Sequence, residues 1–547
     1  MSARRAICVT GFAMATSAGF LAMSPWTRAS APRLSREALA SAFDADMRHV
    51  VYEWDPGDPR PQSERRQALF DFMYETYDAS AWIPQSVFDG NLVTQAVVGD
   101  VDTIVGEHVG LVLWRDNAQV KAFGMAPNVE PPERHGARLK PSRLRSPTIL
   151  TSYGEARRSA FGAKAARDDD RAPLRWTVNC LVCHTAEIDG VAYLGAGTKV
   201  FDELWLGEAL KRLTSAPWRS LLRPGTVDAA LAADANRILQ SHHHDKIDSL
   251  TRARSTAFAA SHVELYMRPH NGVMPAFDEV GRGDVKTPPL WHTAAKMPAG
   301  RWYTDGSFHG PFPLMASSME LEKDRPFDAL VQVVVPTIKA EFASVIRHLR
   351  PPRYPYAIDR TLAARGRELF YSHDIGCANC HGVYDGEGQV EWPGVHADVG
   401  TDRSRLDVVS DGFIEAFNGS PIAAEGSLVA SHGYAATPLT GVWANYPYLH
   451  NGSVPTLYHL LGPVSERPGI FHVMAARRLD RQRVGQPLVA DPRLARLGES
   501  EWRRRFGNDR DWFNVSRPGS GNGGHDVWPR IRTDANRRAL IEYLKTL

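Results

Sequence analysis

The chain has 547 residues, which is long enough for two or three domains with ordinary hydrophobic cores. Its 64 Lys and Arg residues nearly balance its 62 Asp and Glu residues, so the charge indicates neither a nucleic-acid-binding protein nor one that binds an acidic membrane surface. It has only five cysteines, and four of them fall in two short motifs, so a disulfide framework is not expected.

Residues 1–31 have the layout of a secretory signal peptide. Arg4 and Arg5 precede an uncharged stretch from Ala6 to Met23, and Ala29-Ser30-Ala31 fits the A-x-A cleavage pattern. A retained membrane anchor is the alternative, because the apolar stretch is long for a signal peptide. Either interpretation places the rest of the chain outside the cytoplasm, in the periplasm or secreted.

Residues 32–171 are expected to form an irregular N-terminal covering region. Glu64 to Tyr77 has a helical composition, whereas Val97 to Trp114 is mostly apolar and rich in β-branched residues, which favours strands or a buried helix. No motif in this region indicates chemistry, so we expect it to cover the first of the two motifs that follow.

Two copies of the motif C-x-x-C-H come next. The first is Cys180-Leu181-Val182-Cys183-His184, in an expected domain of residues 172–350, and the second is Cys377-Ala378-Asn379-Cys380-His381, in an expected domain of residues 351–547. Two cysteines three residues apart can add across the two vinyl groups of a haem, and the next histidine then binds the iron. The sequence therefore predicts two covalently bound c-type haems, attached at Cys180, Cys183, Cys377 and Cys380, with His184 and His381 as axial ligands.

Paired C-x-x-C motifs have two alternative interpretations, a four-cysteine zinc site and two small disulfides. Neither alternative needs the histidine that follows each motif, which favours haem. The fifth cysteine, Cys8, lies in the expected signal peptide.

Residues 264–310, between the motifs, are dense in Gly, Pro and aromatic residues and include Pro288-Pro289-Leu290-Trp291-His292. This composition predicts an irregular, rigid segment, and such segments often carry the functional residues that wall a cofactor. Phe327 to Leu349 then has apolar positions at helical spacing and ends before Pro351-Pro352, which predicts a closing helix and a domain boundary.

The second unit has the element order of a cytochrome c domain. Asp359 can cap a helix that runs through Phe370, directly before the second motif, and Asp534 to Leu547 has the pattern of a closing amphipathic helix. Together the two units predict a mainly α fold, made of two cytochrome c-type haem domains with an irregular N-terminal covering region.

Several segments carry a resemblance to a known family. They are Ala364-Arg365-Gly366-Arg367-Glu368-Leu369-Phe370, Tyr448-Leu449-His450-Asn451-Gly452-Ser453-Val454 and Tyr543-Leu544-Lys545-Thr546-Leu547. With the spacing of the two motifs, these resemble the bacterial dihaem cytochrome c peroxidase superfamily, which includes the dihaem rubber oxygenases. The rubber-oxygenase-like branch is the most similar, on Tyr354-Pro355-Tyr356, Pro288-Pro289-Leu290-Trp291 and the turn that ends in Gly523-Gly524-His525. The resemblance covers roughly Cys180 to Leu547 and is stronger in the second half.

The resemblance implies two haems with unequal roles. The haem on His184 keeps an exchangeable or empty sixth position for peroxide or O2, while the haem on His381 has a second protein ligand and passes electrons. His525 is the expected second ligand, since it lies on a Gly-rich turn and glycines let the backbone approach a flat cofactor. His450 is the rival, although in the resembling proteins it lies beside the haem.

Trp291 is the expected electron bridge between the haems, because a tryptophan has that role in the resembling enzymes and indole is oxidisable. Packing alone is the alternative, since the chain has 14 tryptophans.

A peroxidase also needs an acid or base near the open iron. Asp278, Glu279 and His292 lie in a suitable segment, but no residue matches the peroxidase glutamate, which leaves room for an oxygenase. Three functions stay open. They are an exported haem oxidoreductase that reacts with peroxide or O2 and uses a small electron-donor protein, a dioxygenase that cleaves an apolar alkene, and an electron carrier in which both irons have six ligands.

Overall fold

The computed structural model describes residues 50–72, 83–84, 175–176, 183–200, 253–255, 283–311, 339–386, 389–407, 409, 411–419, 421–488 and 511–547. The expected signal peptide, the segment Val97 to Trp114, Cys180 and the pair Asp278 and Glu279 lie outside these residues.

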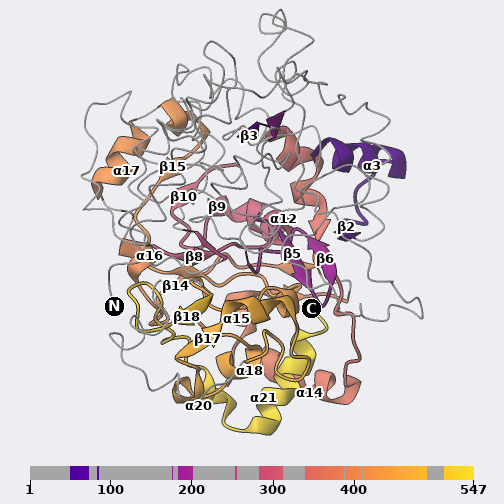
Figure 1. Ribbon diagram of the computed structural model, residues 1–547, viewed down its shortest axis with the longest axis vertical. Coiled ribbons are helices and arrows are strands. Elements are labelled where there is room, and N and C mark those ends of the chain that lie inside the picture. The colour runs from indigo at the N-terminus through magenta and orange to yellow at the C-terminus, as the bar shows by residue number, and fades with distance from the viewer. Residues whose placement is uncertain are drawn as a thin grey trace, which may run out of the picture. The chain divides into compact units, whose positions relative to one another are not determined.

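The described helices are mostly short (Figure 1). They are α3 (Gln62–Phe70), α12 (Thr293–Lys296), α14 (Arg360–Tyr371), α15 (Ala378–His381), α16 (Ser404–Asp407), α17 (Asp411–Asn418), α18 (Leu457–Leu460), α20 (Trp528–Ile531) and α21 (Asp534–Leu544). The 3₁₀ helices are η7 (Leu290–His292), η8 (Met297–Ala299), η10 (Ile346–His348), η11 (Pro421–Glu425), η12 (Val442–Ala444), η13 (Val464–Glu466) and η14 (Val473–Arg477).

The strands form small separate sheets. One has the order β1 (Val50–Val51), β6 (Val191–Leu194), β5 (Thr185–Ile188), and another the order β15 (Ser427–Leu428), β10 (Phe308–His309), β9 (Arg301–Trp302). The two-stranded pairs are β11 (Leu349–Arg350) with β2 (Glu53–Trp54), β12 (Val383–Tyr384) with β13 (Val390–Glu391), β14 (His396–Ala397) with β16 (Tyr434–Ala435), β17 (Ile470–His472) with β18 (Trp512–Asn514), β3 (Ile83–Pro84) with β4 (Arg175–Trp176), and β7 (Arg254–Ser255) with β8 (Val285–Lys286).

The prediction of a mainly α fold is wrong. Of the described residues 36% are helical and 17% lie in strands. The chain contains 44 glycines and 37 prolines, which end helices and favour turns, so much of the backbone runs as loops that pair over two or three residues. The predicted closing helix from Phe327 to Leu349 shows this: residues 339–344 are helical, but η10 and then β11 follow.

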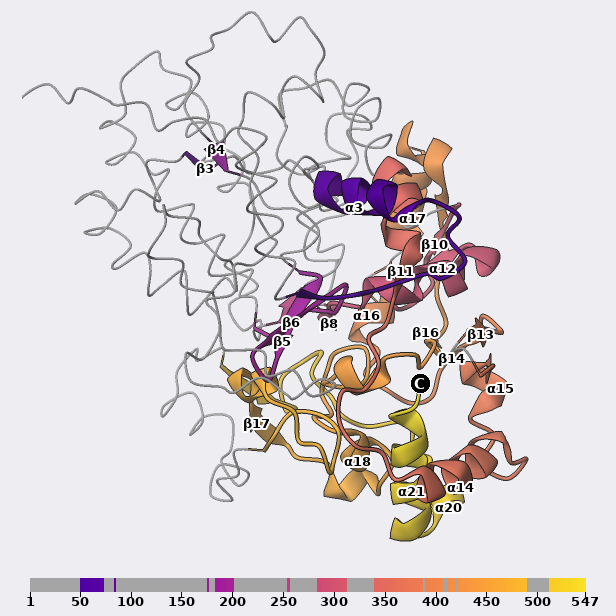
Figure 2. The ribbon, with the colours of Figure 1, turned by 90° about the vertical axis from the view of Figure 1, so that its right-hand side faces the viewer.

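The helix pair of the second unit is confirmed. The Asp359 carboxylate accepts hydrogen bonds from the backbone N–H groups of Thr361 (3.0 Å) and Leu362 (2.9 Å), so it caps α14 as predicted. α14 packs along α21 (Figure 2). The contact is close at Gly366, because a Cβ there would overlap the carbonyl oxygen of Ala539. A glycine inside α14 therefore lets the two backbones approach.

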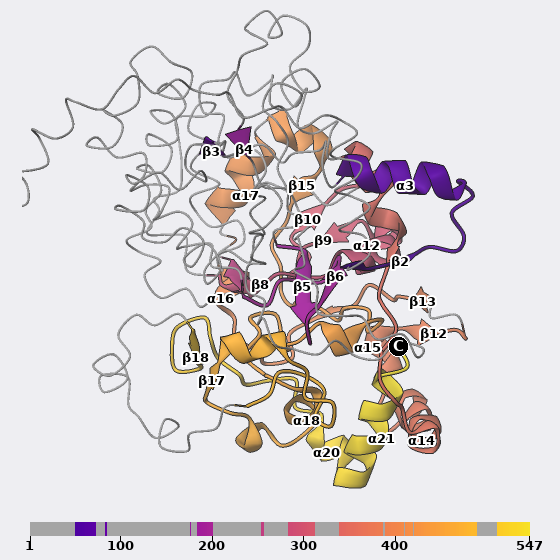
Figure 3. The ribbon, with the colours of Figure 1, turned by 45° about the vertical axis from the view of Figure 1, so that its right-hand side comes forward.

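A single hydrophobic cluster joins the segments that surround the two motifs. It includes Ala186 and Tyr193 from the β5–β6 hairpin, Trp291 from η7, Trp443 from η12 and Leu540 from α21. Figure 3 shows β5 and β6 side by side after the first motif. Residues on both sides of position 350 also share a sheet, because β10 pairs with β15.

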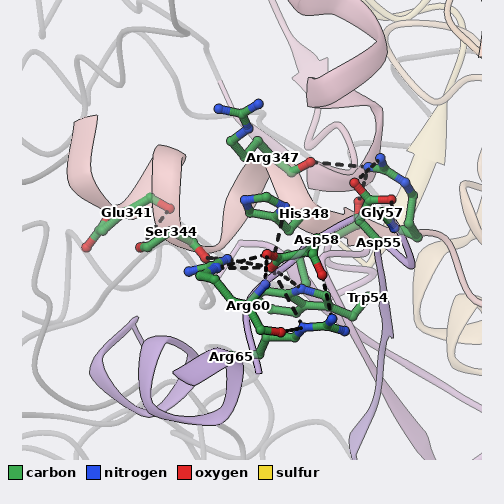
Figure 4. Close-up of polar contacts among 12 residues, drawn as sticks. Trp54, Asp55, Gly57, Asp58, Arg60, Arg65, Glu341, Ser344, Arg347 and His348 are labelled. Atoms are coloured by element: carbon green, nitrogen blue, oxygen red, sulfur yellow. Dashed lines mark hydrogen bonds and ion pairs between the residues drawn. The ribbon is translucent and has the colours of Figure 1, made fainter. Parts of the chain in front are cut away.

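A polar network ties the segment after β2 to the segment before β11 (Figure 4). The Asp58 side chain is 1% exposed and accepts from Trp54 Nε1 (2.7 Å) and from the Arg60 guanidinium (2.8 Å). Arg60 also donates to the carbonyl oxygen of Ser344 (2.7 Å). The hydrogen bonds from Arg60 hold the pKa of Asp58 well below its usual range, so the carboxylate stays ionised.

In the part of the chain that the structure describes, no helix has the length and apolar character needed to cross a bilayer.

Candidate haem site

The second motif forms one helical turn. The carbonyl oxygen of Cys377 accepts from the backbone N–H groups of Cys380 (3.2 Å) and His381 (3.0 Å), which places the three side chains at positions i, i+3 and i+4 on one face of α15. Cys377 and Cys380 are half-buried free thiols, and burial raises the pKa of Cys377 to about 11. The two thiols and the imidazole therefore face the same space.

His381 is oriented as a metal ligand. Its Nδ1–H donates to the carbonyl oxygen of Thr437 at 2.8 Å, which leaves the lone pair on Nε2. Burial lowers the pKa of His381, so the ring is neutral at pH 7. Neutral imidazole with a fixed tautomer is the form that binds iron.

His525 lies opposite His381. The two ring centres are 6.2 Å apart and the rings are inclined at 71°. Metal–nitrogen bonds of about 2 Å put two imidazoles on opposite sides of one ion with ring centres roughly 6 Å apart. Burial, with the nearby His381 as a smaller cause, lowers the pKa of His525 to about 4, so this ring is also neutral. The separation is compatible with one iron between the two rings.

The turn that carries His525 is held by its backbone. Gly524 has φ +72°, and a Cβ there would overlap the backbone at Gly400. The Arg467 guanidinium donates to the carbonyl oxygens of Gly524 (2.8 Å) and His525 (3.2 Å). The glycine thus allows a close approach of two backbone segments, Gly524 and Gly400, while a role beside a cofactor remains a prediction.

A cavity of about 470 Å³ lies between the two histidines and beside the two thiols. Its wall takes side chains from α14, α15, α18 and α21, and most are apolar, among them Phe370, Leu439, Val442, Leu457, Val527 and Leu540. Two thiols, a facing histidine pair and apolar walls fit a covalently attached haem, which is a flat, largely apolar macrocycle. Within the described ranges, no group of three or more His, Cys, Asp or Glu side chains is arranged to hold a metal ion unaided.

The first motif is described from Cys183 onwards. His184 is buried, and its Nδ1–H donates to the carbonyl oxygen of Pro288 at 2.9 Å, the same arrangement as at His381. Burial lowers the pKa of His184 to about 4. The carbonyl oxygens of Cys183 and His184 accept from the N–H groups of Thr198 (2.7 Å) and Gly195 (2.8 Å), so the β5–β6 hairpin holds the motif in place. His184 Nε2 is therefore also available to a metal.

Trp291 lies between the two units. It is 3% exposed, and it packs against Gly195 after β6 on one side and Gly441 before η12 on the other. A Cβ at Gly195 would be 3.4 Å from the indole, and one at Gly441 would be 3.3 Å from it. Nε1 of this indole has no hydrogen-bond partner within the described structure. This place suits the predicted electron bridge, which remains a prediction.

Two other histidines line the cavity. His292 Nε2–H donates to the carbonyl oxygen of Thr440 at 2.8 Å, and burial lowers its pKa to about 3. His450 stacks on Tyr434, with ring centres 3.9 Å apart and planes 12° apart. The ring paired with His381 is that of His525, so the geometry favours His525 over His450 as the sixth ligand.

The cavity wall also contains three cations to which no role was assigned from the sequence, Lys286, Lys296 and Arg530. Lys286 lies two residues before the segment Pro288-Pro289-Leu290-Trp291-His292 that the sequence analysis describes, and Lys296 ends α12 just after it. Their position in the sequence, next to a segment expected to wall the haem, was the clue to their role. Only the fold brings both lysines to the same cavity wall.

Comparisons with known proteins agree with a haem site. Residues 433–472, which include His450, match the family model described as RoxA-like, cytochrome c-like. An uncharacterized protein y4iM of Sinorhizobium fredii is 33% identical over 183 aligned positions, covering 28% of this chain and 40% of that protein. Protein y4iJ of the same organism, also uncharacterized, is 27% identical over 301 aligned positions, covering 43% of this chain and 47% of that protein. The chain thus spans less than half the length of these relatives, and residues 433–472 relate it coarsely to rubber-oxygenase-like haem proteins.

Proposed function

We propose that the chain is an exported dihaem c-type cytochrome oxidoreductase that meets O2 or peroxide at the haem on His184 and passes electrons through the haem on His381. The observation that carries this proposal is the separation of His381 and His525 across the cavity, 6.2 Å between ring centres. A haem with protein ligands on both sides has no position for O2, so it serves electron transfer. Reaction with O2 or peroxide is then left to the haem on His184.

Bound haem supplies the redox chemistry, and the chain's own residues orient and isolate it. The carbonyl oxygens of Thr437 and Pro288 fix the tautomers of His381 and His184. The apolar cavity wall excludes water from the second haem, and Trp291 fills the space between the two units.

A dioxygenase that cleaves an apolar, alkene-containing substrate is the favoured form of this activity. The match of residues 433–472 to the RoxA-like family model supports it, and so does the lack of a sequence match to the peroxidase glutamate. The alternative is a peroxidase supplied by a small electron-donor protein.

An assay with two substrates separates these forms. The purified holoprotein is incubated with an unsaturated isoprenoid oligomer and O2, or with peroxide and a reduced small cytochrome. We expect carbonyl-containing cleavage products that depend on O2 and form without added peroxide. Oxidation of the cytochrome by peroxide, without cleavage of the oligomer, would reject the dioxygenase in favour of the peroxidase.

A further inference from the structure

The cavity beside the second motif has a largely apolar wall that also contains two lysines. Lys286 and Lys296 both line it, and both act electrostatically on His292. Lys286 donates to the carbonyl oxygens of Asn445 and Pro447 and to Asn445 Oδ1, so neutral oxygens surround its charge. Desolvation lowers the pKa of Lys286 to about 7 and that of Lys296 to about 8. Within the described residues neither ammonium group has an ion-pair partner, which an apolar surrounding normally requires.

Lys296 is the less satisfied of the two. Its ammonium nitrogen lies 5.9 Å from the centre of the Trp392 ring, and the described part of the chain gives it neither a hydrogen bond nor an ion pair. A half-buried lysine at the wall of a largely apolar cavity is therefore placed to meet an anionic group of whatever fills that cavity.

His450 places a second polar atom without a partner among the described residues at the same cavity. It is 9% exposed, and its Nε2 has no hydrogen-bond partner within the described residues. Stacking on Tyr434 fixes the ring, and the Tyr434 hydroxyl is itself held by the carbonyl oxygen of Asp402 at 2.6 Å. Lys286 lies beside His450, because its backbone N–H donates to the His450 carbonyl oxygen at 2.8 Å. A buried polar nitrogen without a partner costs free energy, so it too calls for a ligand group.

The direction of the haem is set by its attachment. The vinyl groups that bond to cysteines and the two propionate carboxylates lie on opposite sides of the macrocycle. Arg530 marks the cysteine end, since it donates to the carbonyl oxygen of Ile375 at 2.9 Å and acts electrostatically on Cys377. The carboxylates of a haem bonded to Cys377 and Cys380 would therefore point away from Arg530, into the rest of the cavity, whose wall includes Lys286, Lys296 and His450.

We propose that Lys296 and His450 bind the two propionate carboxylates of the second haem, with Lys286 adding positive charge beside His450. This role makes them positioning residues that also set the reduction potential. A cation close to the propionates offsets their negative charge and favours the ferrous iron. The proposal rests on the second haem of the proposed function and is independent of what reacts at the first.

The test is spectroelectrochemistry of the holoprotein, with the second haem followed through its low-spin signal. Lys296→Met should shift the midpoint potential of this haem to lower values, whereas Lys296→Arg should restore it. His450→Phe, which keeps an aromatic ring against Tyr434, should shift it in the same direction. Lys339→Met is the matched control, because that side chain is 47% exposed and pairs with Glu425. Unchanged potentials in both Lys296→Met and His450→Phe would overturn the proposal.

Infrared difference spectra of wild-type protein give a second measurement that needs no variant. With ¹³C-labelled propionates, the carboxylate bands should have the frequencies of ion-paired, hydrogen-bonded groups, and bands of freely hydrated carboxylates would overturn the proposal. A count of covalently attached haems distinguishes failure of the carboxylate site from failure of the proposed function. If no haem is attached at Cys377 and Cys380, the proposed function fails with it, whereas a full haem count with unaltered potentials rejects only the carboxylate site.

Discussion

At the residue scale, the two expected iron ligands make the same kind of hydrogen bond. Each proximal histidine donates its Nδ1–H to a backbone carbonyl, that of Pro288 for His184 and that of Thr437 for His381. The C-x-x-C-H motif predicts the ligand, but the carbonyl comes from a segment 104 residues away in one case and 56 in the other. The motif therefore identifies the chemistry, and the fold selects the tautomer that makes it possible.

Replacement of His525 tests the facing ligand. His525→Ala removes the ring that lies 6.2 Å from His381, so the second haem should change from low-spin to high-spin. Electron paramagnetic resonance and the visible spectrum report this change. His373→Ala is the control, because that side chain is fully exposed. A low-spin signal that persists in His525→Ala would show that His525 is not the ligand and would favour His450.

Asp58 makes stability depend on pH. Asp58→Asn should lower the free energy of unfolding by roughly 1 to 3 kcal/mol, because Arg60 loses its buried partner. The pKa of Asp58 is depressed in the folded state, so its contribution is full above the unfolded value of about 4 and is lost as pH falls toward the folded value. Denaturant unfolding of both proteins from neutral pH down to about pH 3 measures the difference. The control Asp407→Asn, at a 64% exposed side chain, should change the free energy of unfolding little. A loss of stability in Asp58→Asn that grows as the pH falls would contradict this account.

At the element scale, sequence patterns predicted the regular parts and not the loops. The cap at Asp359 and the final amphipathic helix follow from local residue order, and both are present. The mainly α expectation failed because it extended these two helices to the whole chain. Loop segments such as 430–460 take their shape from long-range partners, for example the donation of the Trp443 indole to the carbonyl oxygen of Pro352. Such partners cannot be read from local periodicity.

Gly366 tests the packing of α14 on α21. Glycine to alanine inside a helix normally stabilises by up to about 1 kcal/mol. Here a Cβ would overlap the carbonyl oxygen of Ala539, so Gly366→Ala should instead destabilise by roughly 1 to 3 kcal/mol. Ala364→Gly, at an exposed position of the same helix, should cost about 1 kcal/mol from propensity alone. Stabilisation by Gly366→Ala in denaturant unfolding would show that the helices can separate freely.

At the scale of the whole molecule, one hydrophobic cluster contains Trp291 and residues near both motifs. Sequence reasoning identified the tryptophan from its Pro-Pro-Leu-Trp context, and the structure places it between Gly195 and Gly441. The burial of Lys286 and Lys296 could not be predicted from the sequence, because it depends on residues that are distant along the chain. The motifs thus predict where a haem would be attached, whereas the side chains around that site depend on tertiary structure.

Trp291→Phe tests communication between the two haems. Phenylalanine keeps most of the packing but is much harder to oxidise, so electron exchange between the haems should slow several-fold while both haem spectra stay unchanged. Rapid-mixing spectroscopy after partial reduction measures this rate. Trp302→Phe, at another buried tryptophan, is the control. An unaltered rate in Trp291→Phe would leave this indole a packing role only.

One haem should be open to ligands, and the other should be closed by His381 and His525. The most direct measurement is an electron paramagnetic resonance spectrum of the oxidised protein, recorded before and after addition of cyanide. We predict a high-spin signal that cyanide converts to low-spin, beside a low-spin signal that cyanide leaves unchanged. Two low-spin signals that cyanide leaves unchanged, both in the protein as purified and after reduction and reoxidation, would contradict this expectation. The protein would then be an electron carrier.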